Sequence, residues 1–192
     1  MNTDRNASTI RAHLPGEPSM WFFVIGDLLI FALYFVSYVF FRGHDHAAFL
    51  QGQQHLNQDL GFINTVVLLT SSLFVALGTT AARAGQRRDA RHLFVLAVLC
   101  GALFPLIKAI EWIPEIRAGH TPGSGLFFMY YYVLAGMHLC HVLLGLVILC
   151  FVVRDLHRSP EPNQRFIETG ATYWHMVDLL WLVLFALFYL MR

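Results

Sequence analysis

Five long apolar stretches run through this chain of 192 residues and constrain its fold more than any other feature. Each reaches the length of about 20 residues that an α-helix needs to cross the hydrocarbon core of a bilayer. Strands of a membrane barrel would be half as long and would alternate apolar with polar residues. The sequence therefore predicts an all-α integral membrane bundle of five transmembrane helices, at residues 21–41, 62–82, 93–113, 127–153 and 171–191.

The segments between these stretches are too short to hold a second domain. We predict a cytoplasmic N-terminal segment at residues 1–19 and one five-helix transmembrane domain at residues 20–192. The first segment lacks the apolar core and small-residue cleavage site of a secretory signal peptide. Arginines gather on the side of the membrane that holds the N-terminus, which predicts that the N-terminus lies inside and the C-terminus outside.

Composition excludes several classes of function. Hydrophobic residues make up 57% of the chain and charged residues only 13%, which is too apolar for a soluble domain of this size. The net charge of +1 offers no basic field for nucleic acid, so we expect no nucleic-acid partner. The three cysteines fall inside apolar stretches without metal-like spacing, which indicates small buried hydrophobic residues.

Ionisable side chains inside the apolar stretches point to function. Each charged group at the centre of a membrane helix costs about 2.5–3.5 kcal/mol to insert, so such groups must pair, become neutral or face the protein interior. Asp27 stands alone in the first stretch, with no partner within a helical turn, and is the best candidate for a proton-supporting group. The other polar groups predict a buried network: Asn64, Lys108, Glu111, His138, His141, Glu168, His175 and Asp178.

Spacing along the helices indicates how these groups pair. Lys108 and Glu111 are three residues apart, so they share a face and can neutralise each other. Glu168, His175 and Asp178 fall along one stripe, with Glu168 just before the fifth stretch. A purely structural hydrogen-bonded bundle explains these groups as well as a proton relay does.

The histidines do not form a recognisable ligand set. His138 and His141 lie three residues apart, and only His175 is available as a third ligand. The sequence has no HExxH motif and no cluster of Cys and His residues. We therefore expect no metal site, no catalytic residue and no redox cofactor in this chain.

Five segments, in order, resemble subunit III of the haem–copper oxidases, the cytochrome c and quinol oxidase group. The similarity covers nearly everything from Met20 onward. The segment around Glu168 and Tyr173–Trp181 is similar to the most specific signature of that family. The other four are MWFFVIGDLLIF at 20–31, Asn64-Thr65 with LLTSS at 68–72, the helix from Phe104 to Glu111-Trp112, and GMHLCHVLLG at 136–145.

The resemblance implies a non-catalytic, accessory subunit of a respiratory oxidase in a bacterial cytoplasmic (inner) membrane. Its partners would be the catalytic subunit I, which carries haem with copper or iron, other subunits and membrane lipid. It would support proton uptake, assembly and stability of subunit I in aerobic electron transport. Asp27 stands where the family usually has Glu.

Departures from the family leave alternatives open. Larger members have seven helices, and this chain resembles a form without the first two, which help to hold bound phospholipid. The Lys108…Glu111-Trp112 pattern, together with residues 127–132, is similar to the short NorE-type branch associated with bacterial nitric oxide reductase. A stand-alone proton or solute transporter using Asp27 and Asp178 is a further alternative, although no inverted repeat supports it.

Overall fold

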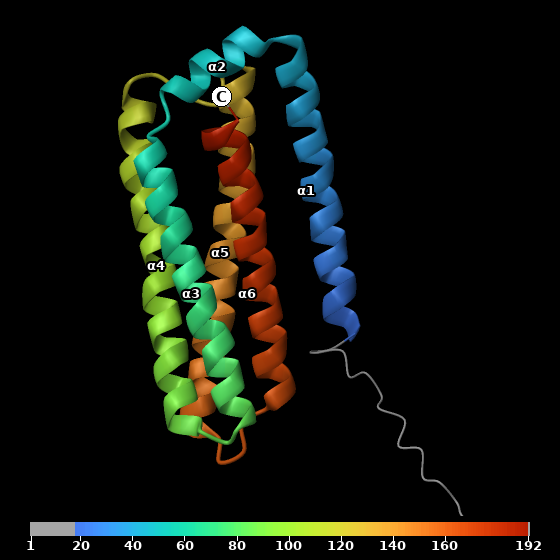
Figure 1. Ribbon diagram of the computed structural model, residues 1–192, viewed down its shortest axis with the longest axis vertical. Coiled ribbons are helices and arrows are strands. Elements are labelled where there is room, and N and C mark those ends of the chain that lie inside the picture. Colours follow the sequence, from blue (N-terminus) through green and yellow to red (C-terminus); the bar gives the residue numbers. More distant parts are fainter. Residues whose placement is uncertain (1–17, 192) are drawn as a thin grey trace, which may run out of the picture.

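The computed structural model describes residues 18–191, and these residues form helices joined by short turns, with no strand (Figure 1). The predicted segment 1–19 lies almost wholly outside the described residues. The helices are α1 (Pro18–His44), α2 (His46–Gln54), α3 (Gln58–Arg83), α4 (Arg87–Arg117), α5 (Leu126–Arg158) and α6 (Gln164–Phe185), which ends in the π-helical turn η1 (Ala186–Leu190).

The prediction of five membrane-spanning helices is confirmed. In the described part of the chain, α1, α3, α4, α5 and α6 with η1 are long and apolar enough to cross a membrane. The helices extend past the predicted apolar stretches, and polar capping residues begin α3 and α6 before those stretches start. The Asn57 side chain, for example, accepts hydrogen bonds from the backbone N–H groups of Asp59 and Leu60 and so starts α3. Glu168, expected just before the last helix, lies inside α6.

The stretch 42–61, expected to be a loop, contains the short helix α2. Asp45 caps its N-terminus by accepting a hydrogen bond from the Ala48 N–H. Phe49, Gly52 and Gln53 are buried on its inner side. The helix lies across one end of the bundle, at the end where the C-terminus also lies (Figure 1). A nine-residue helix falls below the length that a hydropathy window detects, so the apolar pattern could not reveal it.

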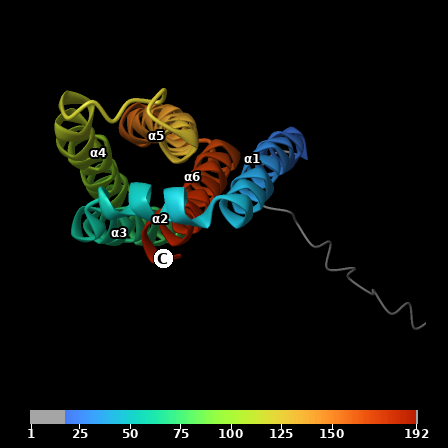
Figure 2. The same cartoon turned by 90° about the horizontal axis from the view of Figure 1, so that it is seen from above.

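The long helices form a four-helix core with α1 at its side. Viewed along the bundle, α3 lies beside α4 and α6, and α5 lies beside α4 and α6 (Figure 2). α6 is the most buried of the five spans, and α1 is the least buried. α1 packs against α6 and α5, and much of its surface is exposed apolar side chain, including Phe22, Leu33 and Val36.

Small residues let the core helices approach α6 closely. The ring of Trp174 lies between Gly101 of α4 and Gly145 of α5. A Cβ atom added at either glycine would lie 2.7 Å from the indole ring, closer than real contacts allow. Packing of backbone against a large flat side chain is a principal source of helix association in membranes.

The two ends of the described chain lie at opposite ends of the bundle, as an odd number of spans requires (Figure 1). The arginine-rich turns between α3 and α4 and between α5 and α6 lie at the end opposite α2. Which end faces the cytoplasm stays a prediction from the arginine distribution.

Candidate functional site

The first polar group in the membrane core surrounds Lys108, which is 1% exposed. Its Nζ lies 2.8 Å from Glu111 Oε2 and donates hydrogen bonds to the hydroxyls of Tyr131 and Tyr189, at 3.2 and 2.8 Å. Tyr189 in turn donates to Glu111 Oε1, and Trp112 Nε1 donates to the Tyr131 hydroxyl. The predicted ion pair is therefore confirmed, and neighbouring side chains from α5 and η1 complete its hydrogen bonding.

Asp27 has a partner that the sequence did not show. His141 of α5 places its Nε2 3.3 Å from Asp27 Oδ2, across the contact between α1 and α5. The two atoms are close enough for an ion pair when His141 is protonated, although Asp27 Oδ2 has no hydrogen-bond partner among the described residues. The expectation that Asp27 lacks a partner held only within its own helix.

The surroundings of His141 fix the direction of its ring. Its Nδ1 bonds the Met137 carbonyl one turn earlier, at 2.7 Å, and Phe31 of α1 meets the ring edge to face. Tyr173 of α6 donates a hydrogen bond to the His141 carbonyl. Asp27, His141 and Tyr173 thus bring titratable groups of α1, α5 and α6 to one place.

His138, one turn before His141, points elsewhere. It is completely buried between Phe104 and Trp181, stacked on the indole of Trp181 at 5.3 Å between ring centroids. Neither ring nitrogen has a hydrogen-bond partner among the described residues. The two histidines share a helix but not a site.

A third polar group lies between α3 and α6. Arg83 forms an ion pair with Glu168 at 2.9 Å, and the Ser72 hydroxyl lies 2.6 Å from His175 Nδ1. Ser72 also interacts with the carboxylate of Asp178, one turn further along α6. The predicted stripe of Glu168, His175 and Asp178 therefore does face one neighbouring helix, along a groove of about 300 Å³ next to Glu168 and His175.

Asn64 lies deep in α3 with no exposed surface and no hydrogen-bond partner among the described residues. The neighbouring Thr65 accepts a hydrogen bond from Trp181 Nε1, and Ser71 donates one to the Ala97 carbonyl of α4. These bonds join α3 to α6 and α4, as small polar residues commonly do in membrane bundles.

Hydrogen bonds and ion pairs thus divide the predicted network into separate groups. Sequence reasoning found both Asp27 and His141 without pairing them. In the other side-chain contacts that a predicted residue makes across helices, it found one member and missed the other. The missed partners are Ser72, Arg83, Tyr131 and Tyr189. The only signal for them was a hydroxyl or a charge inside or beside an apolar stretch, which does not say which helix it will face.

Comparison with known proteins decides the family. The family model for cytochrome c oxidase subunit III matches residues 16–192. The chain belongs to this family. The match includes all five membrane-spanning helices and confirms the resemblance seen in the motifs.

Individual relatives agree with this assignment. The chain is 30% identical over 170 residues to cytochrome c oxidase subunit 3 of Corynebacterium diphtheriae, covering 85% of this chain and 80% of the relative. It is 28% identical to the probable cytochrome c oxidase subunit 3 of Nocardia farcinica over 100% of this chain and 98% of the relative. It is also 30% identical to the haem–copper oxidase subunit I+III of Aeropyrum pernix, covering 90% of this chain but only 22% of that longer protein.

The chain is therefore a subunit III of the haem–copper oxidase type and a multi-pass membrane protein. The contact between Asp27 and His141 differs from the other polar groups in one respect. It joins the peripheral helix α1 to the core, whereas the other groups join core helices to one another.

Proposed function

We propose that this subunit III supports proton uptake, assembly and stability of a catalytic subunit I in aerobic electron transport, with Asp27 as its proton-supporting group. The observation that carries the proposal is the position of Asp27. Its carboxylate is largely buried inside a membrane-spanning helix, 3.3 Å from His141. Histidine gains and loses its proton near neutral pH, and Asp, Glu and His side chains inside membrane proteins form proton relays.

The geometry around Asp27 suits proton exchange better than that around Glu111. Glu111 is held by Lys108 and Tyr189, so its charge is fully compensated by fixed neighbours. Asp27 Oδ2 is buried without a hydrogen-bond partner among the described residues. An oxygen in that situation can accept a proton, or a water that brings one, without breaking an existing bond.

Subunit I is the partner proposed, and it would carry the haem together with copper or iron. The relative from Aeropyrum pernix is named as subunits I and III in one protein, which supports a close association of the two. In this chain, the least buried helix, α1, carries both Asp27 and a largely exposed apolar surface. A partner helix packed on that surface would contact the same helix that carries Asp27.

Purification in mild detergent through a tag on this chain tests the partnership. The proposal predicts that a haem-bearing subunit I co-purifies and gives a haem absorption band in the visible spectrum. Identification of that subunit by mass spectrometry separates a cytochrome c oxidase from a nitric oxide reductase. A preparation that holds this chain alone, without any haem protein, would contradict the proposal.

Substitution of the carboxylate tests the role of Asp27. In the purified complex, Asp27→Asn should leave assembly and the initial rate close to normal but should hasten loss of activity during continuous turnover. Asp27→Glu, which restores the family's usual carboxylate, should turn over as long as the unaltered complex. Asp89→Asn, the same change at an exposed residue at the start of α4, serves as control. Sustained turnover by Asp27→Asn would reduce Asp27 to a packing residue.

A further inference from the structure

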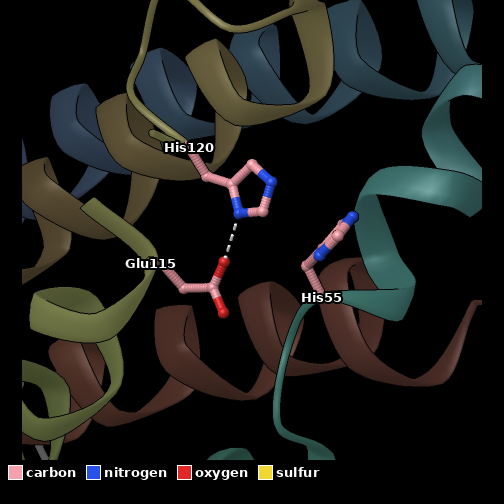
Figure 3. Close-up of side chains that lie close together, drawn as sticks. All are labelled: His55, Glu115 and His120. Carbon is pink, nitrogen blue, oxygen red and sulfur yellow. Dashed lines mark hydrogen bonds and ion pairs between the residues drawn. The ribbon is translucent and has the colours of Figure 1, made fainter. Parts of the chain in front are cut away.

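Three side chains outside the membrane core converge at the α2 end of the bundle. His55 follows α2, Glu115 lies in the last turn of α4, and His120 lies in the turn between α4 and α5. Figure 3 shows the three side chains close together, with Glu115 and His120 joined by their hydrogen bond. One ligand-type atom from each of them lies within 4.8 Å of the other two.

The backbone at the end of α4 brings Glu115 and His120 together. The His120 N–H bonds the Glu115 carbonyl at 3.0 Å, and the Gly119 N–H bonds the Ile116 carbonyl at 3.1 Å. This is the Schellman pattern of a helix C-terminus, which needs a left-handed residue. Gly119 supplies it with a φ of +91°. As a result, His120 Nδ1 lies 2.7 Å from Glu115 Oε2.

The imidazole ring of His120 is held in place by neighbours that are not part of the cluster. The His120 ring stacks on Phe128 with centroids 4.9 Å apart and planes 4° from parallel. The Tyr132 hydroxyl donates a hydrogen bond to the His120 carbonyl. The His55 ring lies 4.2 Å from that of His120, centroid to centroid. Such supporting contacts orient metal ligands in known sites.

The geometry points to a binding site for one divalent transition-metal ion of the zinc type, with His55, Glu115 and His120 as ligands. Zinc binds imidazole nitrogen and carboxylate oxygen at about 2.0–2.2 Å, which places neighbouring ligand atoms roughly 3 Å apart. The 2.7 Å pair of Glu115 and His120 already has nearly this separation. His55 is exposed, so its ring can rotate the short remaining distance.

The remaining coordination position has room for water. A cavity of about 270 Å³ lies beside the cluster and is lined by His55, His120 and Phe128. Metal binding requires that His120 Nδ1 give up the hydrogen it shares with Glu115. The tautomer with its hydrogen on Nε2 meets that requirement. The bound ion would tie α2 to the end of α4 and its following turn.

This site is independent of the proton-supporting role of Asp27, which lies in the membrane-spanning part of α1. Glu115 and His120 are near each other in the sequence, but His55 comes from a distant segment, so no local motif marks the three together. The expectation of no metal site rested on the absence of such a motif.

Zinc binding to the full-length protein in detergent tests the proposal, with a purification tag that contains no histidine. Isothermal titration should show one Zn²⁺ bound per chain, with no comparable binding of Mg²⁺, which prefers oxygen ligands. His55→Ala and Glu115→Gln should each weaken Zn²⁺ binding at least tenfold. His46→Ala, at the exposed start of α2, is the matched control and should bind as the unaltered protein does.

A second readout keeps the test independent of folding. With Cu²⁺ as probe, electron paramagnetic resonance should show two coupled imidazole nitrogens in the unaltered protein and one in His55→Ala. Each variant should elute from gel filtration as the unaltered protein does. Zn²⁺ affinity that is the same in all variants, or absence of binding at micromolar Zn²⁺, would overturn the proposal.

Discussion

At the scale of single residues, the pair of Lys108 and Glu111 shows how this chain keeps charges inside a membrane. Both side chains are only 2% exposed, and their charges neutralise each other. The hydroxyls of Tyr131 and Tyr189 complete their hydrogen bonding. The same lysine lies about 5 Å from the ring centroids of Tyr131, Trp181 and Tyr189, which adds cation–π attraction. The cluster is therefore best explained as structural.

Removal of one charge should show how far the stability of the protein depends on the ion pair of Lys108 and Glu111. Glu111→Gln leaves the buried ammonium of Lys108 without its counter-ion, and loss of one partner of a buried pair costs about 3–5 kcal/mol. Thermal unfolding in detergent should therefore occur at a clearly lower temperature. The double variant Lys108→Met/Glu111→Gln should recover part of the loss. Equal stability of Glu111→Gln and the unaltered protein would show that Lys108 is not charged there.

From the sequence, contacts between side chains could be predicted only within a single helix. The three-residue spacing of Lys108 and Glu111 was enough, because both partners share a helical face. The partner of Asp27 could not be predicted, since His141 comes from α5, far along the chain. Which helices face each other is decided by packing over the whole bundle, and no local pattern records it.

At the scale of helices, close contact around Trp174 holds α4, α5 and α6 together. Gly101 and Gly145 form the two sides of the space that the indole fills. The apolar stretches predicted that these helices exist, but the match between a glycine on one helix and a tryptophan on another could not be predicted. The short helix α2 was missed for a related reason, because its fixed place comes from buried Phe49 and Gly52 rather than from hydropathy.

Two alanine substitutions in the same helix should have different effects. Gly145→Ala places a methyl group 2.7 Å from Trp174 and should destabilise the bundle by about 1–3 kcal/mol through overpacking. Gly136→Ala, where nothing lies within 4 Å, should be neutral or slightly stabilising because alanine favours helix. Thermal unfolding of both variants in the same detergent compares them. If Gly145→Ala were as stable as Gly136→Ala, α5 and α6 would pack less closely than described.

At the scale of the whole molecule, the distribution of arginines predicts which end faces the cytoplasm. Single cysteines at Arg88 and Gly123, in a background without the three native cysteines, place one label at each end of the bundle. In sealed right-side-out vesicles, a membrane-impermeant maleimide should label Gly123→Cys but not Arg88→Cys. The opposite labelling would reverse the predicted orientation.

The five spans, their order and the family were predictable from the sequence because hydropathy and motifs are local. The division of the buried polar residues into separate groups was not predictable, since it depends on the positions of α1 and η1 against the core. In that arrangement Asp27 and His141 share no hydrogen bond or ion pair with Lys108 or Glu111 among the described residues. The proton-supporting role proposed for Asp27 follows from this arrangement.

Proton uptake measured directly during a single turnover tests this role most closely. A pH indicator dye in stopped-flow mixing reports proton uptake by the complex, while haem absorbance reports electron transfer in the same sample. The account predicts that Asp27→Asn slows proton uptake while electron transfer begins at its normal rate, and that Asp27→Glu and Asp89→Asn behave as the unaltered complex. Proton uptake by Asp27→Asn at the unaltered rate would contradict it.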